Sequence, residues 1–78
     1  MHMEGILMNT AMELKRRIID VLSMNPATMR DVGDVLEHEG YARRDVYNMM
    51  RKMNKRELIC TREMNPKQCY VRMWKVKS

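Results

Sequence analysis

The sequence ARRDVYNMMRKMNKRELI, from Ala42 to Ile59, decides the fold of this chain because it combines a helical pattern with the start of a strand. Val46, Met50 and Met53 are spaced by four and then three residues, so they share one face of a helix. The apolar pair at 58–59 follows directly and begins an extended segment. We therefore expect one amphipathic helix that runs into a strand.

The other face of this helix is basic and polar. It carries Arg43, Arg44, Tyr47, Asn48, Arg51, Lys52, Lys55 and Arg56. Such a mixture meets phosphates by charge and base edges by hydrogen bonds. The pattern predicts a helix that binds duplex DNA.

The length of the chain limits what else it can do. Seventy-eight residues make one domain with one small core. The sequence has no paired carboxylates, no Cys-His or Ser-His-Asp set and no glycine-rich phosphate loop, so we do not expect an enzyme. Cys60, Cys69, His2 and His38 do not form a metal-ligand pattern, and we expect neither a metal nor a cofactor.

Charge is unevenly distributed along the chain. The net charge is +5 and the sequence pI is about 9.6. Residues 42–78 contain eleven Lys or Arg and three acids, a net charge of +8, whereas residues 1–41 sum to −3. A basic second half favours a polyanionic partner.

No stretch approaches the roughly 20 apolar residues that a membrane span needs, and the sequence does not open with a secretory leader. Two cysteines are too few for a disulfide framework, which favours a reducing compartment. We expect an intracellular protein, cytoplasmic or nucleoid-associated, without a membrane partner.

The first half of the chain predicts an arm and two helices. Residues 1–9 lack regular periodicity and read as a flexible arm, whose opening Met-His-Met has the character of a cloning remnant; the domain then covers 10–78. A capping box from Thr10 to Glu13 starts a helix that ends at Asn25-Pro26. Its apolar stripe consists of Leu14, Ile18, Val21 and Leu22.

Thr28 to Asp31 repeats the start signal for a second, shorter helix, whose expected buried set is Val32, Val35 and Leu36. Gly33 costs helix stability, so its presence suggests that a neighbouring helix approaches too closely for a side chain. Gly40 can adopt the left-handed conformation that closes the helix.

Two extended runs, 58–64 and 69–76, flank a turn that contains Pro66 and predict a β-hairpin. Symmetric pairing about this turn sets Ile59 opposite Trp74 and Thr61 opposite Arg72. We expect Trp74 to close the core, with stacking on a base or ribose as the alternative.

Three helices and a hairpin, with a basic third helix, resemble the winged helix-turn-helix family over about Thr10 to Val76. The residues that carry this resemblance are Val32-Gly33-Asp34-Val35-Leu36 in the second helix, and Val46, Met50, Met53 and Lys55-Arg56-Glu57-Leu58-Ile59 in and after the third. Glu57 departs from the family's usual glycine, and Glu37-His38-Glu39 reads as an acidic insertion near the DNA face. The last strand is also partly similar to Z-alpha domains, but the spacing in the third helix differs.

The resemblance implies an α+β, mostly helical fold with a C-terminal hairpin wing, and a small transcription regulator that places its third helix in the major groove. The expected base contacts are Arg44, Tyr47, Asn48 and Arg51. The expected phosphate contacts are Arg43, Lys52, Lys55, Arg62, Lys67 and Arg72. One module contacts a short site, so we expect a homodimer or a second protein. The alternative is a protein-interaction module whose Tyr41, Tyr47 and Met49 form an exposed patch.

Overall fold

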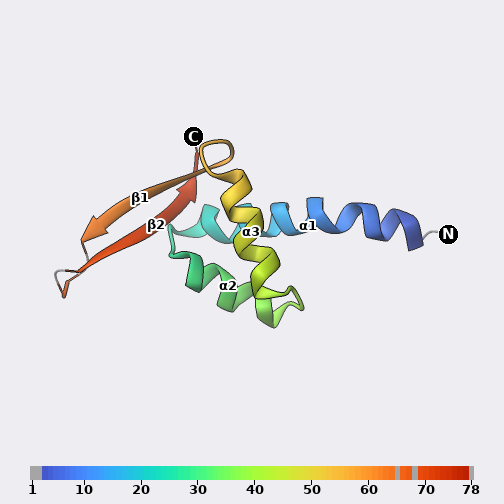
Figure 1. The fold of residues 1–78 in the computed structure, drawn as a ribbon, viewed down its shortest axis with the longest axis horizontal. Coiled ribbons are helices and arrows are strands. Elements are labelled where there is room, and N and C mark those ends of the chain that lie inside the picture. The colour runs from blue at the N-terminus through green and yellow to red at the C-terminus, as the bar shows by residue number, and fades with distance from the viewer. Residues whose placement is uncertain (1–2, 65, 68, 78) are drawn as a thin grey trace.

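The computed structural model describes residues 3–64, 66–67 and 69–77. Three helices precede one antiparallel hairpin: α1 Met3–Met24, α2 Met29–His38, α3 Arg43–Met53, β1 Leu58–Met64 and β2 Tyr70–Val76 (Figure 1). This is the predicted fold class, α+β and mostly helical with winged helix-turn-helix topology. The first turns of α1 and the tip of the hairpin project in opposite directions (Figure 1), which gives the molecule extents of 52 × 25 × 20 Å.

Helix α1 begins seven residues earlier than its capping signal predicts. It starts at Met3, so Thr10 lies inside the helix, and the expected start at Thr10 is wrong. Residues 3–9, which we expected to form a flexible arm, contain no proline, and they include the good helix formers Glu, Leu and Met beside Gly5, so the helix runs through them. Residues 1–2 lie outside the described residues. The helix ends at Met24, as the following Asn25-Pro26 predicts.

Helix α2 starts and ends where its sequence signals predict. The Thr28 hydroxyl accepts a hydrogen bond of 3.1 Å from the Asp31 amide and caps the helix. After the helix, Gly40 has a φ of 99°, in the left-handed region. Val32 and Leu36 are buried as expected, but Val35 is 44% exposed, so its place in the expected buried set is wrong.

One core joins all five elements. Its fully or nearly buried members are Leu14, Ile18, Leu22, Val32, Leu36, Val46, Met50, Met53, Leu58 and Trp74. The three apolar residues predicted for α3 are therefore confirmed. Trp74 is 5% exposed and closes the core, which confirms the first of its two predicted roles.

The hairpin register differs by one residue from the predicted one. Cys60 lies opposite Trp74, whereas Ile59 lies opposite Lys75 and Thr61 opposite Met73. The predicted pairing of Ile59 with Trp74 is wrong. Leu58 is fully buried, and because side chains alternate along a strand, its burial places Cys60 rather than Ile59 beside the tryptophan.

The corner between α3 and β1 contains no glycine. Lys55 takes the left-handed conformation there, with a φ of 69°. Glu57, which stands where the resembling family usually has glycine, reaches back to α1 and pairs with Lys15. That ion pair holds the corner against the first helix, and the Lys15 ammonium lowers the pKa of the Glu57 carboxyl.

Candidate nucleic-acid interface

The outward face of α3 presents three of the four predicted base-contacting residues. Arg44, Asn48 and Arg51 are all exposed and are spaced by four and three residues, opposite the buried stripe of the same helix. Arg51 Nη1 donates a hydrogen bond of 3.3 Å to Asn48 Oδ1. Two guanidinium groups and one amide therefore form a continuous polar strip.

The charges on this strip are available to a partner. Among the residues that the structure describes, the ion pairs engage Lys15, Arg17 and Arg43, and neither Arg44 nor Arg51 has a carboxylate partner. Lys52 is exposed at the edge of the strip, where it lines a shallow groove between α3 and α1 with Ala11 and Met49. An exposed guanidinium group that is not already paired with a carboxylate can form charge-assisted hydrogen bonds with an external anion.

Tyr47 and Arg43 lie on a different side of α3, facing α2. Arg43 Nη1 donates to the Tyr47 hydroxyl at 3.0 Å, and the guanidinium carbon lies 5.9 Å from the centre of the tyrosine ring. Both side chains are half-buried. The prediction that Tyr47 shares the outward face with Arg44 is therefore wrong. Tyr47 lies one residue before Asn48, and this offset around the helix turns its side chain toward Gly33 of α2.

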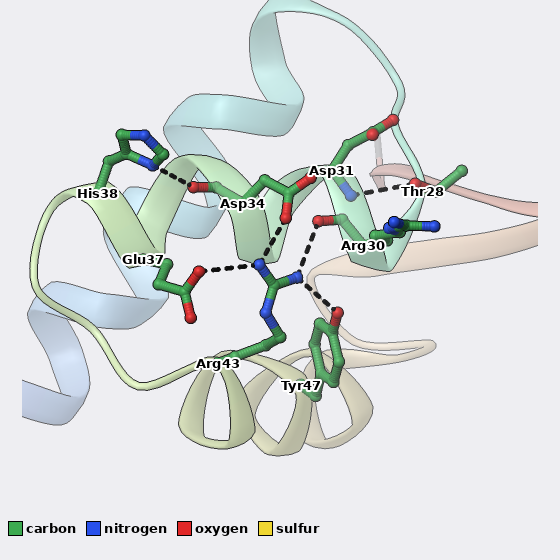
Figure 2. A network of polar contacts seen from close by, with 8 residues as sticks. All are labelled: Thr28, Arg30, Asp31, Asp34, Glu37, His38, Arg43 and Tyr47. Atoms are coloured by element: carbon green, nitrogen blue, oxygen red, sulfur yellow. Dashed lines mark hydrogen bonds and ion pairs between the residues drawn. The ribbon is translucent and has the colours of Figure 1, made fainter.

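Two acids of α2 hold Arg43, a predicted phosphate contact. Its Nη2 donates to Asp34 Oδ1 at 2.5 Å and to Glu37 Oε1 at 3.0 Å (Figure 2). The hydrogen bond to Tyr47 and the two carboxylates raise the pKa of Arg43, and its own hydrogen bond lowers the pKa of Asp34. Sequence reasoning missed these acids as partners, although their spacing of three residues on a helix places them on one face.

Glu39 does not lie near the predicted DNA face, contrary to the expectation for the acidic insertion. Arg17 of α1 holds it with two hydrogen bonds, from Nε to Oε1 at 2.9 Å and from Nη2 to Oε2 at 2.7 Å. This pairing lowers the pKa of Glu39. Its negative charge is thus neutralised beside the first helix and does not face the exposed strip of α3.

The outer half of the hairpin carries a second basic surface. Arg62 and Arg72 lie directly opposite each other, and Met64 and Tyr70 form the next pair on the same face. The Arg62 guanidinium lies 5.0 Å from the centre of the Tyr70 ring. Of the other predicted phosphate contacts, Lys67 is in the exposed turn at the tip and Lys55 is exposed at the helix-to-strand corner.

The residues of the alternative protein-binding patch are not exposed. Tyr41, Tyr47 and Met49 are each half-buried, and the Tyr41 hydroxyl donates to Glu13 Oε1 at 3.3 Å. Their apolar surface is largely used inside the molecule. These three side chains therefore do not form the exposed patch that the alternative predicts.

Within the described ranges, no helix has the length and apolar character required to cross a membrane, and no three His, Cys, Asp or Glu side chains are grouped to hold a metal ion. Compared with protein-family models, curated proteins and solved structures, the chain matches none.

Proposed function

We propose that this protein binds duplex DNA as a small transcription regulator, with the outward face of α3 in the major groove and the hairpin on the neighbouring backbone. The observation that carries the proposal is the strip of Arg44, Asn48 and Arg51, which is exposed on one face and is not neutralised by carboxylates of the described residues. Acting on DNA would place the protein in the cytoplasm or the nucleoid.

The three side chains suit base readout. An arginine reaches the O6 and N7 atoms of guanine with two hydrogen bonds, and asparagine makes the equivalent pair with adenine. The major groove is about 12 Å wide and admits an α-helix. Because Arg44 and Arg51 are two turns apart on α3, they would reach different base pairs.

The hairpin supplies the charge that positions the helix. Arg62 and Arg72 are on one face, and Lys67 is at the tip. Lys52 and Lys55 flank α3 and its corner. Each phosphate neutralised releases counterions, so affinity for DNA would fall steeply as salt is raised. A single module covers a short site, and we expect specific binding to require a second copy or a second protein.

The test is a fluorescence-anisotropy titration of a labelled mixed-sequence duplex at several salt concentrations. We expect the wild type to bind with a steep salt dependence and the Arg44→Glu/Arg51→Glu variant to lose binding while keeping its circular dichroism spectrum. The matched control compares two single variants, Arg16→Glu and Arg44→Glu. Both residues are exposed arginines, but Arg16 is on α1 and lies outside the proposed interface.

Equal losses for Arg16→Glu and Arg44→Glu would reduce the effect to net charge and refute the placement of α3 in the groove. Absence of salt-sensitive binding by the wild type would refute DNA binding altogether. An acidic protein partner would then be the next candidate.

A further inference from the structure

Where α2 and α3 meet, the side chains of Tyr47 and Arg43 leave little room for a Cβ atom on Gly33 of α2. A Cβ atom on Gly33 would lie 2.9 Å from Tyr47 Cε1 and 3.0 Å from Arg43 Nη1. A contact of 2.9 Å is too short for a Cβ atom, so a larger residue at this position would have to displace the Tyr47 ring or the Arg43 guanidinium. The two side chains that fill the crossing both come from the first two turns of α3.

One guanidinium group spans this crossing. Arg43 donates to the Tyr47 hydroxyl on its own helix and to three acceptors on α2: the Arg30 carbonyl at 3.4 Å, Asp34 and Glu37. Figure 2 shows these acceptors arranged around the guanidinium from the beginning to the end of α2. A planar group with five donors in fixed directions holds several acceptors at defined positions, which a lysine ammonium does not.

We propose that Arg43 is a positioning residue, which fixes the orientation of α3 on α2, and that it does not bind a DNA phosphate. This inference rests on the proposed function. Arg44 follows Arg43 directly but points outward, so a rotation of α3 about its axis would move Arg44, Asn48 and Arg51 together. The Arg43 network therefore sets where these three side chains meet the groove.

Electrostatics argue against a phosphate at Arg43. A phosphate that approached its guanidinium would also approach the carboxylates of Asp34 and Glu37, which are held at 2.5 and 3.0 Å from Nη2. The negative phosphate and the negative carboxylates would then be close together and would repel each other. Arg44, Arg51 and Arg72 offer the same positive charge, and none of them has a carboxylate partner within the part of the chain that the structure describes.

Salt dependence distinguishes a positioning residue from a phosphate ligand. Losing one phosphate contact lowers the slope of log affinity against log salt by about 0.9, whereas losing a positioning contact lowers affinity at every salt concentration without changing that slope. We expect Arg43→Gln and Arg43→Lys both to weaken binding severalfold at an unchanged slope. Arg72→Gln is the control that lowers the slope.

A second variant acts from the α2 side. Asp34→Asn/Glu37→Gln removes two negative charges near the interface, so electrostatics alone would predict tighter DNA binding. Loss of the positioning network predicts weaker binding instead. The pKa of Asp34, followed by NMR, should rise in Arg43→Gln, because the hydrogen bond that lowers it is lost, and this rise reports the broken network in the absence of DNA.

Three results would overturn the inference while leaving DNA binding intact: a lower salt slope in Arg43→Gln, full affinity in Arg43→Lys, or tighter binding by Asp34→Asn/Glu37→Gln. Failure of the wild type to bind duplex at low salt refutes the proposed function itself, and the inference with it. The two failures are therefore distinguishable in one titration series.

Discussion

Ala27 and Trp74 exchange both of their backbone hydrogen bonds, from Ala27 N to Trp74 O at 3.0 Å and from Trp74 N to Ala27 O at 2.7 Å. This single bridge joins the connection between α1 and α2 to the second strand of the hairpin. It holds the tryptophan backbone in place while its side chain closes the core. The wing is therefore attached to the helical body by backbone as well as by apolar contacts.

Replacing Ala27 with proline removes the N–H group that donates to Trp74. We expect Ala27→Pro to lower the free energy of unfolding by about 1–3 kcal/mol, because the Trp74 carbonyl loses its partner. Urea denaturation measures the loss, and hydrogen exchange at the Trp74 amide should accelerate. Ala27→Ser keeps the N–H group and serves as the control. Equal stability of the proline and serine variants would show that the bridge contributes nothing.

The two threonine capping signals should behave differently. Thr28 caps α2 through its hydroxyl, so Thr28→Ala should cost about 0.5–2 kcal/mol of stability. Thr10 lies inside α1, where alanine is the better helix former by up to about 0.7 kcal/mol, so Thr10→Ala should cost nothing. Thermal or urea unfolding of both variants checks this. A matching loss at Thr10 would mean that α1 starts there.

Filling the crossing at Gly33 should destabilise the fold. A valine there would overlap Tyr47 and Arg43, and overpacking of this kind costs about 1–3 kcal/mol. Urea denaturation provides the measurement. Gly40→Ala is a useful comparison, because Gly40 has positive φ and open space around it, so its substitution strains the backbone without touching Arg43. Of the two variants, only Gly33→Val should raise the pKa of Asp34. An Asp34 pKa as low as in the wild type would contradict the close packing at Gly33.

Stability should fall in acid through three ion-paired carboxyls. Arg43 lowers the pKa of Asp34, Arg17 that of Glu39 and Lys15 that of Glu57. At pH values between the lowered and the ordinary carboxyl pKa, the folded state therefore binds fewer protons than the unfolded state, so protonation favours unfolding. The stabilisation is complete above the ordinary carboxyl pKa of about 4 and is lost as pH falls through the lowered values.

The measurement is urea unfolding from about pH 6 to about pH 2, in the wild type and in an Asp34→Asn/Glu39→Gln/Glu57→Gln variant. The variant should be less stable near neutral pH, and its stability should change less with acid. Parallel pH profiles would show that these pairs do not contribute.

Replacing one arginine of the Arg62/Arg72 pair on the hairpin should raise stability and weaken DNA binding. Like charges directly opposite each other on one face of a sheet are destabilising, so Arg72→Thr should stabilise the hairpin by a few tenths of a kcal/mol, within the roughly 0.2–1 kcal/mol range of such pairs. Under the proposed function, the same variant should lower the salt slope of DNA binding by about 0.9. Denaturation and anisotropy on one preparation test both effects. A stabilised variant with an unchanged slope would remove Arg72 from the interface.

Much of this structure could be predicted from the sequence, since local signals and tertiary packing agree in α2 and α3. The spacing of Val46, Met50 and Met53 predicted the buried face of α3, and the Thr28 cap and Gly40 bounded α2. The same spacing predicted Arg44, Asn48 and Arg51 on the opposite face. These features depend on periodicity and on backbone chemistry within a few residues, which are present in the sequence itself.

Predictions failed where the outcome depended on a distant part of the chain. The start of α1 was misplaced because the stretch from Thr10 to Glu13 matches a capping box, although Thr10 lies inside the helix and not at its end. The hairpin register was displaced because burial of Leu58 in the helical core, not symmetry about the turn, sets which side chains face inward.

The sequence by itself determined the order of helices and strands, the amphipathic faces of α2 and α3 and the basic second half, because each follows from residue spacing and charge. Tertiary structure decided how those charges are used. Arg43 and Arg44 are adjacent and chemically identical, yet α2 packs against only one of them. Asp34 and Glu37 hold Arg43, whereas Arg44 is left to solvent, and this difference exists only after the two helices have packed.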